Sequence, residues 1–290
     1  MPAIRDTWAL LRDTVLSWID DDASTLGAAL AYYTLFSIAP LLLIVIALAG
    51  LVFGEQAARG GVIDELRGLM GDDGARAVES LLASANRDGH GVWATVGGSI
   101  VLLIGATSVF AELQNAMDRI WRVAAEPPAV GVWSWVRRRL LSVGMILGIG
   151  FLLMVSLVAS AALAALGRWW APLLGGAGLL GSVFDFVLSL ALVTLAFAMI
   201  YKWMPRVRLR WHDVWIGAAV TALLFTLGKQ LIGTYLGRSG IASGFGAAAS
   251  LVAMVLWVYY SAQIFLLGVE FTWIWARRHG SLRDAVKASG

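Results

Sequence analysis

The chain has 290 residues, of which 59% are hydrophobic and 14% are charged, and it carries a formal net charge of +3 and no cysteine. This composition excludes a soluble enzyme with a membrane anchor, and it predicts one all-α membrane domain over residues 1–290. The lack of cysteine excludes disulfides, a thiol nucleophile and a cysteine-based metal site. Membrane topology accounts for the small basic excess, so we expect no nucleic-acid partner.

Residues 1–22 are predicted to form a cytoplasmic amphipathic helix. Apolar side chains recur there at steps of three, four and three residues, so they share one stripe of a helix. The stripe consists of Trp8, Leu11, Val15 and Trp18. Two interpretations stay open: the helix lies on the inner membrane surface, or it packs against the rest of the protein. The apolar segment that follows is too long for a signal peptide, so we expect the start of the chain to be retained.

Six apolar stretches follow, and each is long enough to cross a hydrocarbon core of about 30 Å, which takes about 20 helical residues. They run over 24–53, 93–121, 139–166, 182–204, 213–237 and 248–275. The loop at 54–92 is long for a connection without structure of its own. Its apolar spacing predicts short amphipathic helices, separated by the sequence Gly-Asp-Asp-Gly at 71–74.

Basic residues gather in every second gap between these stretches. If both termini lie in the cytoplasm, the inner segments hold 15 of the 22 Lys and Arg residues, in agreement with the positive-inside rule. Eight of the 14 tryptophans then fall at the inner boundary, where indole rings are favoured. The sequence therefore predicts six transmembrane helices with both termini inside, and it places 54–92 in the periplasm.

The first span contains a proline near its middle. Pro40 removes the hydrogen bond to the carbonyl group of Phe36, and it is expected to kink the helix. Taken alone, this segment is compatible with an ordinary structural kink, which is common in membrane helices, and with a functional break.

Polar side chains form a stripe on three of the spans, and all three stripes reach the inner half of the membrane. Ionisable groups inside a span cost about 2.5–3.5 kcal/mol each, and they normally face a partner or a wet cavity. We therefore predict a cytoplasm-facing substrate cavity with the kink beside it. The residues of this predicted cavity are Tyr33, Ser37, Pro40, Glu112, Asn115, Tyr260, Gln263 and Glu270.

Basic residues at the inner boundary are predicted to form the rim of this cavity, where they would favour an anionic headgroup or an acidic solute. They are Arg119, Arg122, Arg137, Arg138 and Arg139. The alternative is an interfacial network, in which Glu112, Arg119 and Glu270 extend to the boundary and basic neighbours neutralise the acids.

One further charge lies inside a span. Lys229 falls in the outer half of the membrane, and its expected partner by depth is Asp185.

Four motifs, in order along nearly the whole chain, resemble one known family. They are LAYYTLFSIAP at 30–40, FAELQNAMDRIW at 110–121, Gly217-Ala218 with Lys229 and Tyr235, and LWVYYSAQIFLLGVE at 256–270. This pattern resembles that of the YihY/BrkB membrane proteins. The resemblance implies a bacterial inner-membrane protein with six helices. It also implies a link to serum resistance, and to transport of lipid or other envelope precursors.

The same family has carried the label ribonuclease BN, which these residues do not support. A metal-dependent nuclease needs clustered carboxylates or histidines, whereas His90, His212 and His279 lie on different segments. We therefore expect no enzyme, no metal site and no cofactor.

Two classes of function remain. The first is a transporter or flippase-like protein that moves a lipidic, amphipathic or anionic envelope-related solute through the polar cavity. The alternative is a non-transporting scaffold for envelope machinery. The expected partners are membrane lipids and an anionic lipid or amphipathic solute, and either class is compatible with an oligomer.

Overall fold

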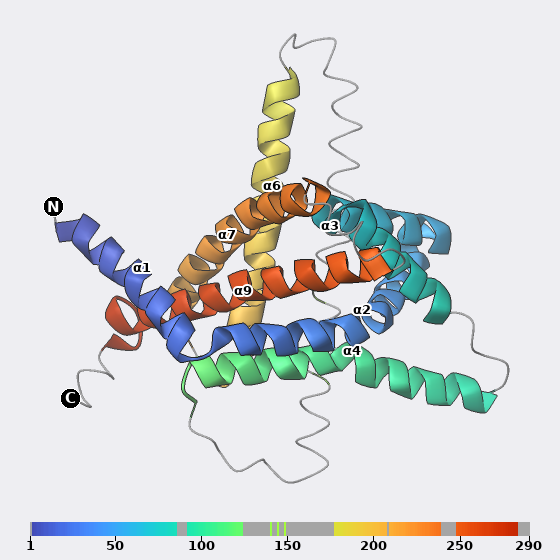
Figure 1. The fold of residues 1–290 in the computed structure, drawn as a ribbon, viewed down its shortest axis with the longest axis horizontal. Coiled ribbons are helices and arrows are strands. Elements are labelled where there is room, and N and C mark those ends of the chain that lie inside the picture. Colours follow the sequence, from blue (N-terminus) through green and yellow to red (C-terminus); the bar gives the residue numbers. More distant parts are fainter. Residues whose placement is uncertain are drawn as a thin grey trace.

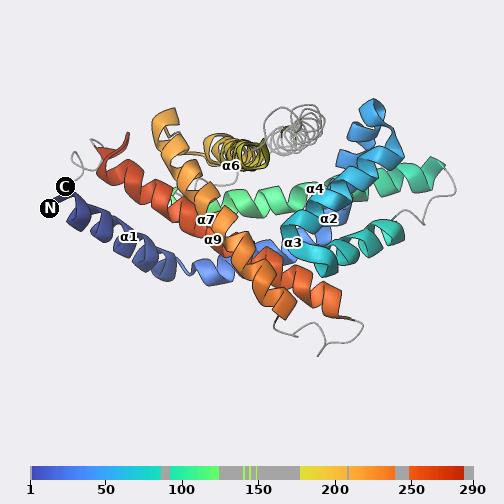
Figure 2. The same ribbon diagram turned by 90° about the horizontal axis from the view of Figure 1, so that it is seen from above.

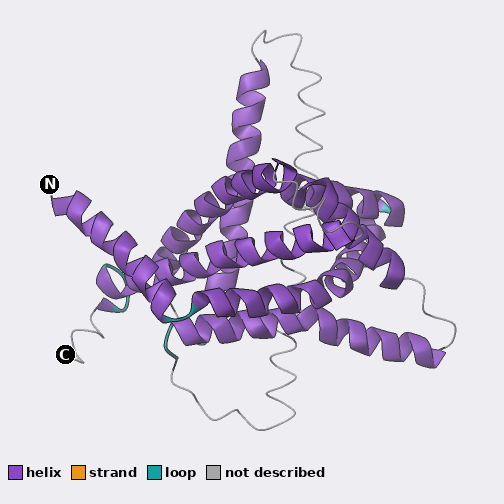
Figure 3. Cartoon of the chain, in the orientation of Figure 1, coloured by secondary structure: helices purple, strands orange, loops and turns teal. Residues whose placement is uncertain are grey.

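The computed structural model describes residues 2–85, 92–123, 177–207, 209–238 and 248–283, together with Leu140, Gly144 and Gly148. Within these ranges the chain is helical apart from short turns, and it contains no β-strand (Figure 3). The predicted all-α fold class is therefore confirmed.

Most of the described helices coincide with predicted elements. They are α1 (Pro2–Asp20), α2 (Ala23–Phe53), α3 (Glu55–Ala85), α4 (Val92–Ile120), α6 (Ala177–Trp203), α7 (Trp211–Arg238) and α9 (Ala249–Arg278) (Figure 1). Five of them, namely α2, α4, α6, α7 and α9, fall on five of the six predicted spans. The third predicted span, at 139–166, lies outside the described ranges apart from three single residues.

Among the described residues, four helices are long and apolar enough to cross a membrane. Their apolar parts are Ala23–Leu51, Phe186–Trp203, Trp211–Tyr235 and Ala249–Arg278. Large apolar side chains also remain exposed on these helices. On α7, Leu223, Leu227 and Leu231 recur every fourth residue and are 48%, 64% and 67% exposed. Such a stripe fits contact with lipid. The total of six spans and their orientation stay predictions.

Helices α2 and α9 form the centre of the arrangement. α2 packs against α4, α3 and α9, while α9 also packs against α7, α3 and α1 (Figures 1 and 2). α6 packs against α7 and crosses the direction of α2 and α9 steeply in Figure 1.

Two clusters of buried apolar side chains divide this arrangement along α2. The first cluster joins the start of α2 to the ends of α4, α6 and α9 and to the start of α7, with Leu26, Trp121 and Leu266 among its members. The second cluster joins the rest of α2 to α3 and to the first part of α9. The candidate site described below lies beside the first cluster.

Helix α3 covers the second cluster and is broken at Gly71, where φ is 78° and ψ is 177°. Glycine adopts such a positive φ at little cost, whereas this conformation is unfavourable for residues with a Cβ atom. The break lets both halves of α3 bury apolar side chains, including Val62, Met70 and Val78. It falls in the sequence expected to separate two helices at 71–74. The periplasmic location of this segment stays a prediction.

Helix α1 packs against α9. Leu10 and Thr14 are buried and Trp18 is partly buried, whereas Trp8 is 71% exposed and Val15 is 49% exposed. The helix therefore contacts the protein through a face beside the predicted apolar stripe. Contact of the exposed part of that stripe with the membrane surface stays a prediction.

Candidate functional site

Glu270 is the most deeply buried ionisable residue of the predicted cavity, with a side chain that is 0% exposed. Its segment of α9 is fixed against the end of α4. Trp121 donates a hydrogen bond from Nε1 to the carbonyl oxygen of Val269 over 3.2 Å, and its ring stacks on Trp273 with the centroids 6.3 Å apart. The polar atom of a buried indole usually finds such a partner, which positions both helices.

Helix α7 approaches the same segment of α9 closely because small residues face each other. A Cβ atom added to Gly268 would overlap Oγ1 of Thr221, and one added to Gly217 would overlap Oγ1 of Thr272. Thr221 also shares a hydrogen bond of 2.9 Å with the hydroxyl group of Tyr201 on α6. Glu270 is thus carried by a tightly packed part of the protein.

The polar neighbours of the Glu270 carboxyl group come from the last turn of α1 and from the turn that follows it. They are Ser17 and Asp21, while the guanidinium group of Arg122 acts on Glu270 electrostatically. The N–H group of Asp21 donates to the carbonyl oxygen of Ser17 over 2.9 Å, so the two side chains stand one helical turn apart. The site therefore brings two acids and one base together where α1, α4 and α9 meet.

Neither oxygen of the Glu270 carboxyl group has a hydrogen-bond partner among the described residues, and Oδ2 of Asp21 also has none. A buried polar atom without a partner costs about 1–3 kcal/mol, and more when it is charged. Buried groups of this kind call for a specific explanation, because the great majority of buried polar atoms are hydrogen-bonded.

Two left-handed turns create this junction. Asp22, with φ 52°, connects α1 to α2, and Arg122, with φ 50°, follows the end of α4. They are the non-glycine residues with positive φ in the described part of the chain. A left-handed non-glycine residue costs about 1–2 kcal/mol, less for aspartate than for arginine, and such residues gather at functional sites.

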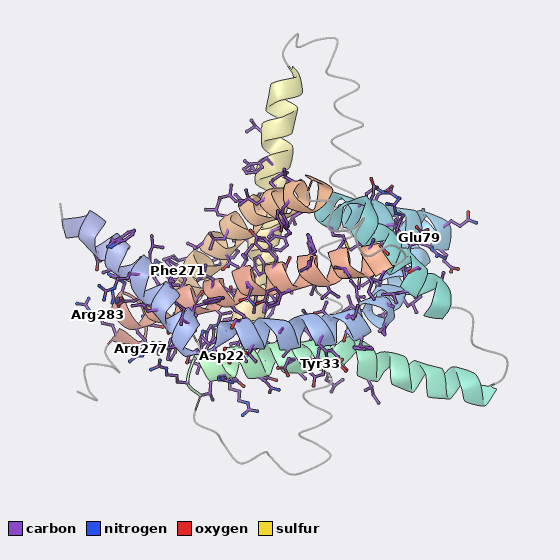
Figure 4. All side chains as sticks on the ribbon, viewed as in Figure 1. Asp22, Tyr33, Glu79, Phe271, Arg277 and Arg283 are labelled. Atoms are coloured by element: carbon purple, nitrogen blue, oxygen red, sulfur yellow. The ribbon has the colours of Figure 1, made fainter. Side chains whose placement is uncertain are left out.

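An open pocket of about 390 Å³ lies beside this junction, between α1 and α9. It is lined by Asp13, Leu16, Ser17, Asp20, Ile274, Arg277 and Arg278. Arg278 forms an ion pair with Asp13, and the Arg277 guanidinium lies 5.6 Å from the centre of the Trp273 ring. Figure 4 places Asp22 and Arg277 at the end of the molecule where α1 meets α9.

The predicted cavity residues on α2 make a different contact. Ser37 donates a hydrogen bond of 2.6 Å to the carbonyl oxygen of Gly105 on α4, and its hydroxyl group lies 2.8 Å from that of Ser108. A Cβ atom on Gly105 would lie 3.0 Å from Cγ of Pro40. Pro40 and Ser37 therefore lie at a close contact between α2 and α4, and both the expected kink at Pro40 and its role stay predictions.

The polar residues in the middle of α9 face two different helices. Gln263 donates to the carbonyl oxygen of Ser24 over 3.4 Å, and it occupies the space left by the missing side chain of Gly27. Tyr260 lies against Gly228 of α7, where its hydroxyl group would be 3.3 Å from an added Cβ atom.

The remaining predicted residues are less enclosed. Tyr33 and Asn115 are exposed, and Glu112 is half-buried. The two open pockets characterised among the described residues, between α1 and α9 and between α3 and the start of α9, are lined by other side chains. A single cavity lined by all of the predicted residues stays a prediction.

The predicted rim and the predicted intramembrane pair are described only in part. Arg122 lies at the junction with Glu270, while Arg119 is exposed on the last turn of α4. Residues 137–139 lie outside the described ranges, as does the side chain of Asp185, so its pairing with the half-buried Lys229 stays a prediction.

The sequence interpretation missed the contribution of α1 to the site. Ser17 and Asp21 were not among the predicted site residues, although Asp20, Asp21 and Asp22 directly precede an apolar span. That run of acids was a usable signal, because a cytoplasmic boundary normally carries basic residues.

No group of three His, Cys, Asp or Glu residues that could hold a metal ion is found in the described part of the chain.

Long apolar helices with exposed leucines and a buried carboxyl group between them define a multi-pass α-helical membrane protein. The chain belongs to the BrkB family, because the family model described as "Virulence factor BrkB" matches residues 14–289. The resemblance seen in the four motifs is thereby confirmed.

The relatives are described by name only as membrane proteins. The chain is 30% identical over 282 residues to a UPF0761 membrane protein of Cronobacter sakazakii, with 92% of this chain and 90% of the relative covered. It is 27% identical to one of Pseudomonas aeruginosa, covering 90% of this chain but only 62% of that relative. A relative from Tolumonas auensis is 31% identical over 179 residues, or 60% of this chain and 55% of the relative. No solved structure matches the chain.

Proposed function

We propose that this protein is a transporter of the bacterial inner membrane, of the flippase-like kind, and that it moves an anionic amphipathic solute such as an acidic lipid. The observation that carries the proposal is the open pocket between α1 and α9 with the buried Glu270 next to it. We propose no enzymatic role.

The pocket offers both kinds of contact that an anionic lipid needs. Arg277 and Arg278 supply positive charge for a headgroup, and Leu16 and Ile274 supply apolar surface. The Asp13 carboxylate already engages Arg278, so an anionic headgroup would compete with it there.

The position of the pocket fits a cytoplasmic binding step. With both termini inside, the ends of α1 and α9 lie at the inner face of the membrane, where anionic lipids attract basic side chains. Glu270 then lies deeper in the membrane than the arginines, next to Ser17 of the pocket wall.

A reconstituted flipping assay tests this proposal. Purified protein would be placed in vesicles that contain fluorescent phosphatidylglycerol or phosphatidylcholine, and a membrane-impermeant quencher would report exchange between leaflets. We expect wild-type protein to increase the rate of exchange between leaflets more for the anionic lipid than for the neutral one. The Arg277→Gln variant should exchange the anionic lipid about tenfold more slowly than the wild type, as expected when one charge-assisted contact is lost.

Arg283→Gln is the matched control, because Arg283 is an exposed arginine that does not line the pocket. Equal losses in both variants would show a general charge effect and contradict the proposed pocket. If neither lipid moves faster with wild-type protein, the non-transporting scaffold becomes the better proposal.

A further inference from the structure

The least satisfied polar atoms at the junction belong to two carboxyl groups. Glu270 is fully buried and neither of its oxygens has a hydrogen-bond partner among the described residues, while Asp21, which also has a buried oxygen without a partner, is its neighbour. We propose that Glu270 and Asp21 form an acid pair that binds one proton between them. The role of this proton, which is to accompany the movement of the solute, rests on the proposed function.

Two ionised carboxyl groups cannot form a hydrogen bond with each other, because carboxylates can only accept hydrogen bonds. A bound proton supplies the missing donor. Two ionised acids side by side repel each other, and neither can satisfy the other. If one of them is protonated, its O–H group donates to the other carboxylate. That single proton gives both groups a partner and removes one buried charge. Carboxylate pairs that share a site bind protons as a unit in this way.

Counting charges leads to the same number of protons. Among the residues that the structure describes, the charged groups that act on Glu270 are Asp21, in the turn between α1 and α2, and Arg122, directly after α4, and Ser17 of α1 adds a neutral hydroxyl group. Two carboxylates and one guanidinium carry a net charge of minus one. One bound proton makes the group neutral, which is the least costly state for a buried cluster.

A metal cation fits this group less well. A calcium ion is bound by about 6–8 oxygen ligands, whereas the described residues next to Glu270 offer the carboxyl group of Asp21 and the hydroxyl group of Ser17 beside its own carboxyl group. The Arg122 guanidinium already supplies a positive charge and would repel a second one. A proton needs only the two acids.

Infrared spectroscopy of the purified protein in micelles of a detergent without ester groups tests the acid pair directly, because a protonated carboxyl group has a carbonyl band apart from those of carboxylates and amides. We expect the wild type to show this band at neutral pH and to lose it at alkaline pH. Glu270→Gln and Asp21→Asn should each lose the band at neutral pH, since the remaining acid is neutralised by Arg122 without a proton.

Arg122→Asn gives the opposite expectation. This variant keeps a residue that tolerates the left-handed conformation, but it removes the positive charge, so the pair needs a second proton and the band should grow. Asp22→Asn is the matched control for Asp21→Asn. Asp22 is exposed, adopts φ 52° and accepts a hydrogen bond of 3.3 Å from Ser24, all of which asparagine can reproduce. The Asp22→Asn variant should therefore show the carbonyl band with the same intensity as the wild type.

Two results would overturn the acid pair: a wild-type protein without the band at neutral pH, or an Asp21→Asn variant that keeps the band unchanged. Circular dichroism and the elution profile of each variant would show whether it is folded, and the milder Asp21→Asn variant covers the case in which Glu270→Gln does not fold. The spectra need no transport. A protein that shows the band but moves no lipid would refute the proposed function and leave the acid pair in place.

Discussion

At the scale of single residues, the packing of α7 on α9 depends on glycines that leave no room for a side chain. Gly268 faces Thr221, which in turn binds the Tyr201 hydroxyl group. These contacts connect α6, α7 and α9 next to the segment that carries Glu270. In membranes, where apolar burial against other helices gains little over burial in lipid, close backbone approach and interhelical hydrogen bonds hold helices together.

Gly268→Ala should therefore destabilise the protein by about 1–3 kcal/mol, the usual effect of overpacking. Unfolding in mixed micelles of increasing sodium dodecyl sulfate content would measure this loss. Gly233→Ala on α7 is the control, because an added Cβ atom there meets nothing within 4 Å. It should be neutral or stabilise the helix by up to about 1 kcal/mol. Thr221→Ala combined with Gly268→Ala should recover part of the loss by removing the overlapping hydroxyl group.

At the scale of elements, a single residue, Gly71, allows the two halves of α3 to cover the second cluster on α2 and α9. The break at Gly71 separates a half that buries Val62 from a half that buries Val78, and both halves belong to the second cluster with α2 and α9. At φ 78° and ψ 177° a Cβ atom is unfavourable, so a substitution there would strain the break or straighten it.

We expect Gly71→Ala to loosen the second half of α3. Hydrogen exchange should become faster over 72–85 than in the wild type, while α9 beyond the second cluster keeps its protection. Gly68→Ala is the control, because Gly68 has ordinary helical φ and an added Cβ atom meets nothing within 4 Å. Equal exchange in Gly71→Ala and Gly68→Ala would show that the break does not depend on glycine.

The elements were the part of the structure that the sequence predicted well. The stretch predicted at 213–237 is observed as Trp211–Arg238, and the one at 248–275 as Ala249–Arg278. Length and apolar composition determine such helices almost alone. The buried face of α1 was harder to predict, because Leu10 and Thr14 are buried beside the apolar stripe.

The candidate site was predicted only in part, for a physical reason. Glu270 stood out because an ionisable side chain inside an apolar span is costly. Its neighbours Ser17 and Asp21 reach it through the left-handed turn at Asp22. Helical periodicity says nothing about the direction that a chain takes after such a turn. Gln263 and Tyr260 were grouped by helix face alone, whereas their contacts depend on which neighbour carries a glycine.

At the scale of the whole molecule, orientation decides whether the pocket between α1 and α9 faces the cytoplasm. The chain contains no cysteine, so single cysteines can be labelled without interference. Glu79 on α3 and Arg210 before α7 are both exposed and lie on opposite sides of the membrane in the predicted topology.

An impermeant thiol reagent added to intact spheroplasts should therefore label Glu79→Cys and leave Arg210→Cys unlabelled until the cells are opened. The reverse pattern would place the α1–α9 pocket at the outer face and contradict a cytoplasmic binding step. Labelling of both variants in opened cells is the control for accessibility.

Ser17 belongs both to the wall of the open pocket and to the surroundings of Glu270. If the acid pair binds a proton as proposed, a solute in the pocket lies one side chain away from that proton, and the two binding events share a free energy of coupling. Such coupling is reciprocal: if an anion in the pocket strengthens proton binding, a bound proton strengthens the anion's affinity by the same factor. An anionic lipid that binds in the pocket would thus favour proton binding at the acid pair. With the pocket at the inner face of the membrane, as proposed, the cytoplasmic pH would then set the fraction of protein molecules that hold a lipid.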